Sequence, residues 1–415
     1  MININKLEDI ISDQSSAFRS KDIGVIRDIN FQKYLRTNQI TAISGIRRSG
    51  KSTLLAQFSR KIKQFYYISF DDERLLGFEV SDFQNLMLAF RKTHQAQTIF
   101  LDEIQNVPKW ERFVRRIYDE GYKVFITGSN AKLLGSELAT HLTGRYFKID
   151  LYPFSFKEFL MFKKKDFQMK GTIAQADILK NFDYYLKQGG FPEFVKHQDS
   201  EFVKRIYEDV IYKDLLVRFQ IKDTKNFKQL ANYLFANFTQ EISYHSLKNT
   251  LNFKSATSVK NYLEFMQESY LIFELYKYDY SLKKQYVSDK KVYVIDNGMR
   301  NTVAFSFSED KGKMLENLIF IELKRRGQEI YYYKDKKECD FIIKEKNKIT
   351  SAVQATLALT KENKKREIEG LLEAMDEFKL KQGLILTLNE EDIIKIDKKK
   401  LIIKPVYKWL IGTDV

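Results

Sequence analysis

Cysteine, histidine, proline and glycine are all scarce in this chain of 415 residues. The single cysteine, Cys339, cannot form a disulfide within the chain, and the four histidines are too scattered for a metal-ligand spacing. Only four prolines and 17 glycines are present, which excludes a collagen-like or low-complexity design and favours uninterrupted helices and strands. A disulfide-stabilised scaffold and a zinc finger are therefore excluded.

Long hydrophobic runs are missing as well. No stretch of about 18 consecutive apolar residues occurs, and candidates such as 384–388 have the length of a strand. The first residues, MININKLEDI, carry acidic side chains where a signal peptide needs an apolar core of about 7–15 residues. We therefore expect a cytoplasmic protein without a membrane partner.

Charge, in contrast, is abundant and unbalanced. The chain has 70 Lys+Arg against 55 Asp+Glu, a formal net charge of +15, and its 44% of hydrophobic residues excludes global disorder. Such a surplus indicates nucleic acid or an anionic surface as a partner, although a lysine-rich proteome produces it too. At roughly 100–200 residues per domain, the length allows several folding units.

A phosphate-binding loop lies in the segment 39–55, QITAISGIRRSGKSTLL, between a strand pattern and a helix pattern. Its spacing, G-x-x-x-x-G-K-[ST], lets backbone N–H groups approach a phosphate at a helix N-terminus. We predict that Lys51 reaches the β- and γ-phosphates of ATP and that Ser52 ligates Mg²⁺. The predicted nucleotide-binding residues of the loop are Gly45, Ile46, Arg47, Arg48, Ser49, Gly50, Lys51, Ser52 and Thr53.

Two carboxylates follow the apolar strand pattern TIFLDE at 98–103. Ligands gather at the carboxyl edge of parallel sheets, so Asp102 is predicted to hold the Mg²⁺ shell. Glu103 is predicted to act as the general base that polarises the attacking water. The alternative is a strand followed by an aspartate that caps a helix.

A third strand pattern, 123–127, leads into Gly128, Ser129 and Asn130. Because parallel strands end at the same edge of a sheet, Asn130 or Ser129 is expected to hold the attacking water or the γ-phosphate. Both residue types also serve as helix N-caps, so this interpretation stays open.

These motifs, together with LTGR at 142–145 and LYPFSFKEF at 151–159, resemble the bacterial and archaeal AAA+ ATPase family with a C-terminal domain of unknown function. The resemblance covers nearly the whole chain. It implies an α/β fold, with a doubly wound parallel sheet over 1–150 and a helical lid over 151–222. It also implies that Arg145 senses the γ-phosphate, in its own subunit or across a homo-oligomer interface; a surface arginine in a turn is the alternative.

The segment QGGFPE at 188–193 is similar to the Gly-Gly-Phe-Pro segment of the family's lid. By analogy with related signalling ATPases, Pro192 would pack near the adenine and report the nucleotide state. Glycines followed by proline are also a good signal for the end of one helix and the start of the next.

Residues 223–300 have the pattern of a winged helix-turn-helix, with helices predicted in 242–251 and 255–271 and a strand pair at 271–276 and 291–295. The second helix would enter a DNA major groove and the lysines of the wing would neutralise phosphates, whereas protein docking is the alternative. The predicted DNA-contacting residues are Ser258, Lys260, Asn261, Lys283, Lys284, Lys290 and Lys291.

Residues 301–415 resemble a restriction-endonuclease-like α/β fold, whose sites use an Asp and a Glu-x-Lys pair to hold Mg²⁺ and orient water. Glu316 in a helical pattern and Asp340 in a strand pattern match that order. Gln354 and Thr356 stand in place of the pair and supply neither the carboxylate nor the positive charge. We therefore expect a degenerate site that does not cut DNA.

The leading functional hypothesis is a Mg²⁺-dependent AAA+ ATPase that binds DNA and couples ATP hydrolysis to its remodelling or translocation, as a homo-oligomer. A regulatory switch or scaffold controlled by ATP binding is the first alternative, and Glu103 argues against it because a switch needs no catalytic base. A binding module for an unknown protein partner and a nuclease are the remaining alternatives.

Overall fold

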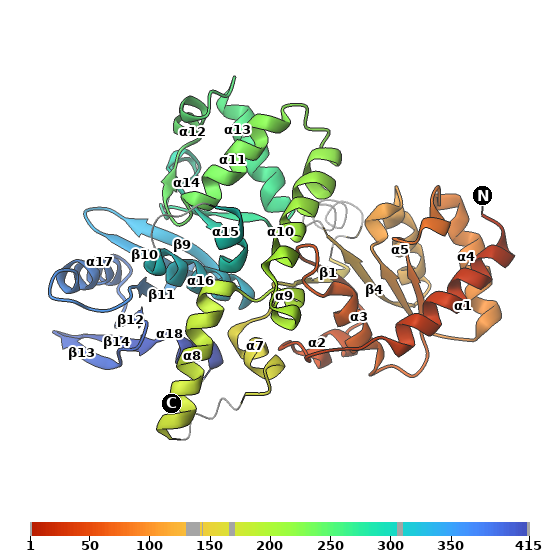
Figure 1. Cartoon of the computed structure of the whole chain (residues 1–415), viewed down its shortest axis with the longest axis horizontal. Coiled ribbons are helices and arrows are strands. Elements are labelled where there is room, and N and C mark those ends of the chain that lie inside the picture. Colours follow the sequence, from red (N-terminus) through yellow and green to blue (C-terminus); the bar gives the residue numbers. More distant parts are fainter. Residues whose placement is uncertain (1, 130–141, 143, 166–170, 305–309, 413–415) are drawn as a thin grey trace. The chain divides into compact units, whose positions relative to one another are not determined.

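The computed structural model describes residues 2–129, 142, 144–165, 171–304 and 310–412 (Figure 1). The chain divides into two compact units, Met1–Tyr152 and Pro153–Val415. The segments predicted as a lid, a helix-turn-helix and a nuclease-like domain therefore belong to a single unit.

A five-stranded sheet with the strand order β2-β3-β4-β1-β5 forms the centre of the first unit. All of its pairings are parallel, which confirms the parallel α/β sheet expected for this part of the chain. The strands are β1 (Ile40–Ser44), β2 (Tyr66–Ser69), β3 (Thr98–Asp102), β4 (Lys123–Gly128) and β5 (Tyr146–Asp150). Because the strands are parallel, β1, β3 and β4 all end at one edge of the sheet.

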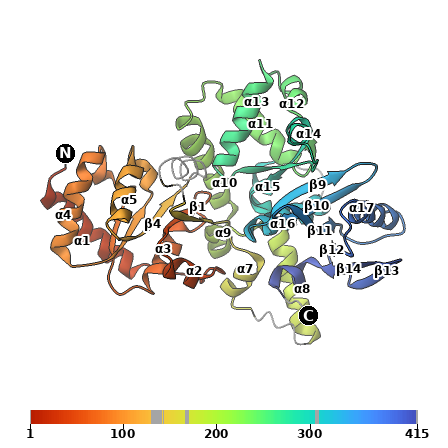
Figure 2. The ribbon, with the colours of Figure 1, turned by 180° about the vertical axis from the view of Figure 1, so that it is seen from behind.

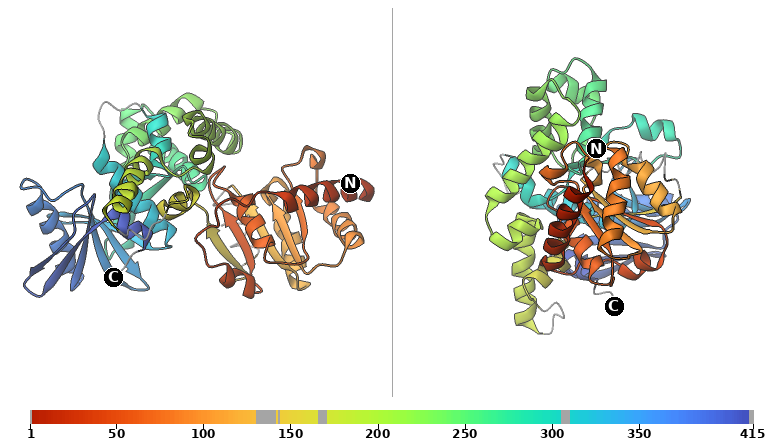
Figure 3. Two further views of the ribbon diagram at one scale, coloured as in Figure 1. Left: turned by 60° about the horizontal axis from the view of Figure 1, so that its bottom comes forward. Right: turned by 90° about the vertical axis from the view of Figure 1, so that its right-hand side faces the viewer.

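Helices cover both faces of this sheet, as can be followed in Figure 3. Along β3, Ile99 and Leu101 join one hydrophobic core while Phe100 joins the other, which is the alternation of a strand buried on two sides. The helices are α1 (Ile4–Ser20), α2 (Phe31–Arg36), α3 (Lys51–Ser59), α4 (Phe83–Thr93) and α5 (Trp110–Asp119), with short 3₁₀ turns at Glu73–Leu75, Val80–Asp82 and Ile104–Asn106.

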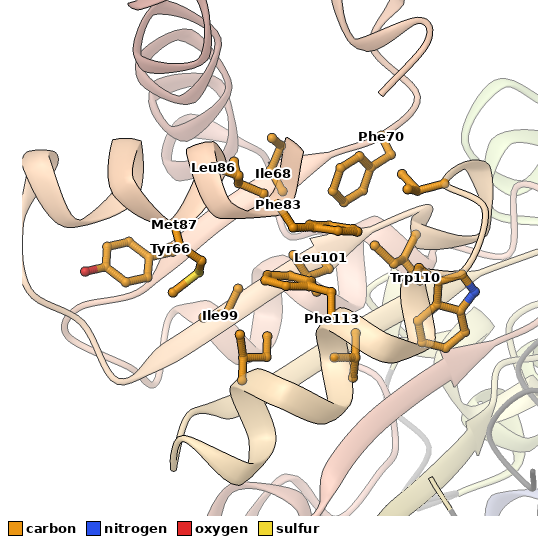
Figure 4. Packing of buried hydrophobic residues seen from close by; sticks show 14 of the residues in the cluster. Tyr66, Ile68, Phe70, Phe83, Leu86, Met87, Ile99, Leu101, Trp110 and Phe113 are labelled. Atoms are coloured by element: carbon orange, nitrogen blue, oxygen red, sulfur yellow. The ribbon is translucent and has the colours of Figure 1, made fainter. Parts of the chain in front are cut away.

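An aromatic stack joins α4 to α5 in the first of these cores (Figure 4). The rings of Phe83 and Phe113 lie 3.9 Å apart and almost parallel, at 7°. Phe78 meets Phe83 edge-on at 5.0 Å. Both stacked rings are buried, so they contribute transfer free energy and ring contacts together.

The second unit begins with a run of helices. These are α7 (Phe156–Phe162), α8 (Thr172–Gln188), α9 (Pro192–His197) and α10 (Ser200–Asp209), followed by a π-helical segment, Val210–Val217. The helices fall in the segment that was expected to be a helical lid.

Residues 224–294 fold as α11 (Thr224–Ala236), β6 (Glu241–Ile242), α12 (Tyr244–Thr250), α13 (Ala256–Glu268), β7 (Ile272–Tyr276), α14 (Leu282–Val287) and β8 (Lys290–Val294). The three strands form an antiparallel sheet in the order β6-β8-β7, so the predicted strand pair is confirmed. Ser243 and Ser255 cap α12 and α13 through their side chains.

The C-terminal part contains a six-stranded mixed sheet in the order β13-β14-β12-β11-β10-β9 (Figure 2). Strands β9 to β11 form an antiparallel meander, and α17 crosses over to β12, which pairs parallel with β11. Cys339 is fully buried in the core beneath α17, where it packs against apolar side chains. The elements are α15 (Asn297–Val303), α16 (Lys311–Arg325), β9 (Glu329–Lys334), β10 (Glu338–Glu345), β11 (Lys348–Ala355), α17 (Lys364–Glu377), β12 (Gln382–Thr387), β13 (Asp392–Ile396), β14 (Lys399–Pro405) and α18 (Val406–Ile411).

None of the helices in the described part of the chain combines the length and the apolar character that crossing a membrane requires.

The aromatic stack gives a test of the first unit's core. We expect Phe83→Ala to lower the free energy of unfolding by about 3–5 kcal/mol, because it leaves a cavity against Phe113. Leu88→Ala is the control, since Leu88 lies on the same helix but is 41% exposed, and we expect a change within about 0.5 kcal/mol. Urea unfolding followed by circular dichroism measures both, and equal losses would contradict the assignment of Phe83 to the core.

Candidate functional site

The loop at residues 45–50 connects β1 to α3, and two glycines shape it. A Cβ on Gly45 would lie 2.2 Å from the carbonyl oxygen of Leu151, so no larger residue fits there. Gly50 adopts a left-handed backbone, with φ of 97°, and is the N-cap of α3; Arg48 is left-handed as well. The loop thus bends around the N-terminus of α3, where unpaired N–H groups and the helix dipole favour an anion.

Lys51 is buried between the loop and an acidic group. Its ammonium donates to the carbonyl oxygens of Gly45 at 3.2 Å and Ile46 at 3.4 Å, and it lies 3.8 Å from the Glu103 carboxylate. Charge-assisted contacts to phosphate oxygens are stronger than contacts to neutral carbonyl groups. The ammonium is therefore placed to exchange these contacts for a phosphate.

Asp102, the last residue of β3, is held by hydroxyl groups. Thr127 on β4 donates to Oδ1, Tyr67 on β2 donates to Oδ2 at 3.2 Å, and the Ser52 hydroxyl is hydrogen-bonded to the same carboxylate. Burial raises the pKa of Asp102, and the nearby charge of Glu103 raises it further. The structure thus brings together Ser52 and Asp102, the predicted metal pair.

Glu103 has a left-handed backbone, with φ of 51° and ψ of 43°, which is uncommon for a glutamate and typical of strained functional positions. Its N–H donates to the Thr127 hydroxyl at 2.8 Å, and the Gln105 amide donates to its carboxylate at 2.5 Å. The side chain stays 22% exposed, so water reaches it. This arrangement suits a group that orients a water molecule.

The residues present fit a nucleotide with its metal ion. Within the described chain, the buried Ser49 Oγ in the loop and Gln105 Oε1 beside Glu103 have no hydrogen-bond partner. No three Asp, Glu, His or Cys side chains in those same ranges could hold a metal ion by themselves. A Mg²⁺ on Ser52 and Asp102 would therefore complete its shell with phosphate and water oxygens, as Mg²⁺ commonly does.

Thr127 and Tyr67 are functional candidates that sequence reasoning missed. The Thr127 hydroxyl donates to the Asp102 carboxylate and accepts from the backbone N–H of Glu103, so it contacts both predicted site residues of β3 and the turn after it. Ser129 is buried at the end of β4, and Asn130 lies outside the described residues. One sequence signal was available for Thr127, since it is a hydroxyl residue at the end of the predicted strand 123–127. In the sheet, that strand lies next to β3, which ends with Asp102.

Arg27 is another functional candidate, and no sequence motif pointed to it. Its guanidinium donates to the carbonyl oxygens of Ser49 at 2.9 Å and Tyr152 at 2.7 Å, and its N–H donates to Gln57 on α3 at 3.1 Å. It is almost fully buried. Arg27 therefore fixes the loop relative to α3 and to the chain that leaves β5.

Arg145 lies at the opposite edge of the sheet from the loop. Its carbonyl oxygen accepts from the N–H of Ile40, at the start of β1, whereas the loop follows the end of that strand. Five residues of strand span about 16 Å, so its guanidinium is far from a nucleotide held by the same loop. That guanidinium lies 3.6 Å from Asp119 and over the ring of Tyr118.

The Gly-Gly-Phe-Pro segment joins two helices, as its residue types indicate. Gly189 is the C-cap of α8, with φ of 74°, and Pro192 is the first residue of α9. Pro192 belongs to the second unit, so its contact with adenine remains a proposal.

Packing explains both glycines. A Cβ on Gly189 would lie 2.0 Å from the Asp296 carboxylate, and one on Gly190 would lie 2.3 Å from the carbonyl oxygen of Phe154. Asp296 accepts the N–H groups of Gly190 and Met299 at 2.8 and 3.0 Å. Burial raises the pKa of Asp296 to about 6.

Four of the predicted DNA-contacting residues are accessible on two helices. Lys260 and Asn261 are exposed on α13, and Lys283 and Lys284 are exposed on α14. Ser258 is half-buried, and its hydroxyl is hydrogen-bonded to that of Ser255 within the helix cap.

The prediction for Lys290 and Lys291 is wrong, because both side chains are buried, at 5% and 4% exposure. They lie in β8, the middle strand of its sheet, where both faces are covered. The Lys290 ammonium donates to the carbonyl oxygens of Tyr286 and Ser288, at 2.6 and 2.7 Å. Lys291 points instead into a group of carboxylates.

Glu316 and Asp340 of the degenerate site come together around Lys291, whose ammonium lies 3.2 Å from each. Gln354 accepts the N–H of Asp340 at 3.3 Å. Thr356 uses its hydroxyl in the turn after β11, where it donates to a carbonyl oxygen. Sequence reasoning missed Lys291 because it lies in a different predicted domain.

Three family models match the chain in succession. One for an AAA domain matches residues 37–160, and two for domains of unknown function match residues 179–310 and 311–408. An uncharacterized protein of Methanocaldococcus jannaschii is 38% identical over 97% of this chain and 94% of that protein. An uncharacterized protein of Haemophilus influenzae is 32% identical over 90% of this chain and 95% of that protein.

Solved structures overlap more loosely. A signal transduction ATPase with numerous domains from Pyrococcus horikoshii has a TM-score of 0.30 at 16% identity, over 74% of this chain and 46% of that chain. The replication initiator DnaA, bound to AMPPCP and single-stranded DNA, has a TM-score of 0.27 at 14% identity, over 59% of this chain and 90% of that chain.

Proposed function

The chain belongs to the same family as these two uncharacterized proteins, and, since it carries an AAA domain, we propose that it is a Mg²⁺-dependent ATPase that couples ATP hydrolysis to the handling of DNA. One observation carries the ATPase proposal. The residues predicted to bind phosphate, to bind the metal and to act as the base lie together at one edge of a parallel sheet; they are Lys51, Asp102 and Glu103. Lys51 is in ion-pair distance of Glu103, and Thr127 is hydrogen-bonded to both Asp102 and Glu103.

Each residue has a role in this mechanism. Lys51 and the loop N–H groups bind the β- and γ-phosphates, and Ser52 and Asp102 hold the Mg²⁺, which neutralises phosphate charge when bound. Glu103 accepts the proton of the attacking water. The Thr127 hydroxyl donates to the Asp102 carboxylate and accepts from the N–H of Glu103. It thus positions both the metal ligand and the base, which have different roles.

Two substitutions separate nucleotide binding from hydrolysis. We expect Lys51→Ala to abolish ATP binding, because it removes the buried ammonium. Glu103→Gln should bind ATP but hydrolyse it about 10²–10⁴-fold more slowly, since the amide cannot accept the proton. Fluorescent-nucleotide titration and phosphate release measure the two effects, and Glu120→Gln, on the exposed end of α5, is the control. Hydrolysis by Glu103→Gln at the wild-type rate would remove Glu103 as the base.

Arg145 supports an oligomeric enzyme. Because it lies at the far edge of the sheet from the loop, it acts in this proposal on the nucleotide of a neighbouring subunit. Its ion pair with Asp119 is a long, partly exposed contact that such an interface replaces readily.

A mixing experiment tests that assignment. Arg145→Ala alone should hydrolyse ATP about 10³-fold more slowly. Mixed with Lys51→Ala, it should regain part of the activity, because the Lys51→Ala subunits supply the arginine. Arg116→Ala, which removes an exposed arginine of α5, is the control and should keep full activity. Absence of any recovery in the mixture would rule out action across subunits.

Residues 224–294 are proposed to be a winged helix-turn-helix that contacts DNA. Support comes from the element order helix, strand, helix, helix, strand, helix, strand, and from the antiparallel order β6-β8-β7. The exposed Lys260 and Asn261 lie on α13, where a recognition helix would be. Lys283 and Lys284 lie on α14, between the strands of the pair, where a wing would be.

DNA stimulation of the ATPase tests this part. We expect duplex DNA to raise the rate and added salt to diminish the effect, because phosphate contacts release counterions. Lys283→Ala/Lys284→Ala should weaken DNA binding and lower the salt slope by about 1–2. Lys364→Ala/Lys365→Ala, an equally exposed pair at the start of α17, is the control. A flat response of the wild type to every DNA would favour the switch or the protein-docking alternative.

No observation favours the nuclease alternative. The Glu-x-Lys positions are Gln354 and Thr356, and both side chains are engaged in hydrogen bonds within the fold.

A further inference from the structure

A buried ammonium stands at the centre of the nuclease-like carboxylates. The Lys291 nitrogen lies 2.6 Å from Glu338, 3.2 Å from Glu316 and 3.2 Å from Asp340. These carboxylates come from α16 and β10, whereas the lysine comes from β8. The Tyr293 hydroxyl, on the same strand, donates to Glu316 at 2.7 Å. The cluster thus joins side chains from three elements, α16, β8 and β10.

The contact distances are those of an ammonium and not of a metal site. Mg²⁺ binds oxygen at about 2.0–2.1 Å, whereas the three oxygens here stand 2.6–3.2 Å from the nitrogen. The resemblance to nucleases implies a divalent ion on Glu316 and Asp340, and the Lys291 nitrogen lies 3.2 Å from both carboxylates. The carboxylates present therefore do not fit a metal while the lysine is there.

The charges of the cluster also favour a cation at this point. Glu316, Glu338 and Asp340 face Lys291, and Lys334 pairs with Glu338 from the outside at 3.4 Å. Burial lowers the pKa of Lys291, but the acidic groups around it outweigh burial and hold the pKa well above its usual value, so the amine keeps its charge. A cluster of carboxylates in this place without such a cation would strongly destabilise the folded protein.

The cluster also fastens β8 to the C-terminal part of the unit. Immediately beyond it, the Asn317 side chain of α16 pairs with both the N–H and the carbonyl oxygen of Val294, at 2.9 and 3.0 Å. The Tyr332 hydroxyl of β9 donates to the carbonyl oxygen of Asp289, just before β8. Strand β8 and the chain just before it are thereby tied to α16 and to the six-stranded sheet next to the Lys291 cluster.

We propose that the Lys291 ammonium is an internal cation that replaces the divalent metal of the nuclease-like pocket, closes that pocket to Mg²⁺, and clamps β8 onto α16 and β10. This inference is independent of the proposed ATPase and DNA functions, because it concerns a different set of residues. It predicts that removing the lysine opens a divalent-cation site that the wild-type protein lacks.

Mn²⁺ binding to the nucleotide-free full-length protein tests the proposal, with electron paramagnetic resonance to count bound ions. We expect Lys291→Met to take up one more Mn²⁺ per chain than the wild type at about 1 mM Mn²⁺. The nucleotide site contributes equally to all variants, so the difference isolates the pocket. Lys291→Met/Asp340→Asn should lose the additional ion, because a ligand is gone.

Lys290→Met is the matched control. Lys290 is the adjacent residue on the same strand and is equally buried, but it contacts backbone carbonyl groups instead of carboxylates. We expect it to bind no additional Mn²⁺. Two outcomes overturn the proposal: a Mn²⁺ on the wild type that Asp340→Asn removes, or a folded Lys291→Met that binds no more Mn²⁺ than the wild type.

Thermal unfolding gives a second readout that includes the clamp. Lys291→Met should lower Tm by roughly 5–10 °C, because it leaves the buried carboxylates of Glu316 and Asp340 without their cation. Mn²⁺ should raise the Tm of Lys291→Met and leave that of the wild type and of Lys290→Met unchanged. If Lys291→Met does not fold in metal-free buffer, Mn²⁺ must restore its folding. If Mn²⁺ neither stabilises nor refolds Lys291→Met, the proposal that the Lys291 ammonium takes the place of a divalent ion is contradicted.

Discussion

A charge taken out of water needs an opposite charge or hydrogen bonds close to it, and this requirement organises both units of the protein. In the first unit, Asp102 is enclosed by the hydroxyl groups of Ser52, Tyr67 and Thr127. In the second unit, carboxylates from α16 and β10 enclose Lys291. The first arrangement surrounds a buried carboxylate with neutral donors, whereas the second surrounds a buried ammonium with carboxylates.

The parts of the fold that local pattern determines could be predicted from the sequence. The loop between β1 and α3, the buried strand that ends at Asp102, and the start of α12 at Ser243 each follow from residues within one element and its neighbours. The positions of Lys290 and Lys291 could not be predicted in this way. Lys291 is buried against Glu316 and Asp340, which lie 25 and 49 positions further along the chain, whereas Lys290 donates to nearby backbone carbonyl groups. Lysines in a polar segment have the same local pattern as a solvated wing.

The same distinction applies to the nucleotide site. Lys51, Ser52, Asp102 and Glu103 follow motif spacing. Arg27 acts through contacts with distant segments, for which one sequence holds no signal, and Thr127 was marked only by its place at the end of a predicted strand. The motif around Arg145 does not show where this residue lies relative to the loop, whereas the parallel pairing of β5 with β1 does. A residue that precedes a parallel strand lies at the amino edge of the sheet, so its separation from the loop is a consequence of strand direction and not of side-chain detail.

Gln354 lies beside the Lys291 cluster and is hydrogen-bonded to both Asp340 and Glu367. Its amide accepts the N–H of Asp340 and donates to Glu367, at 3.3 and 2.7 Å, so it needs both an acceptor and a donor. A glutamate there could not donate, and it would face Glu367 with a second negative charge while Asp340 already shares the single ammonium of Lys291. In a pocket with a divalent ion that additional charge is useful, whereas around a monovalent ammonium it is uncompensated. A neutral residue at position 354 and a lysine at position 291 are therefore two parts of one electrostatic arrangement.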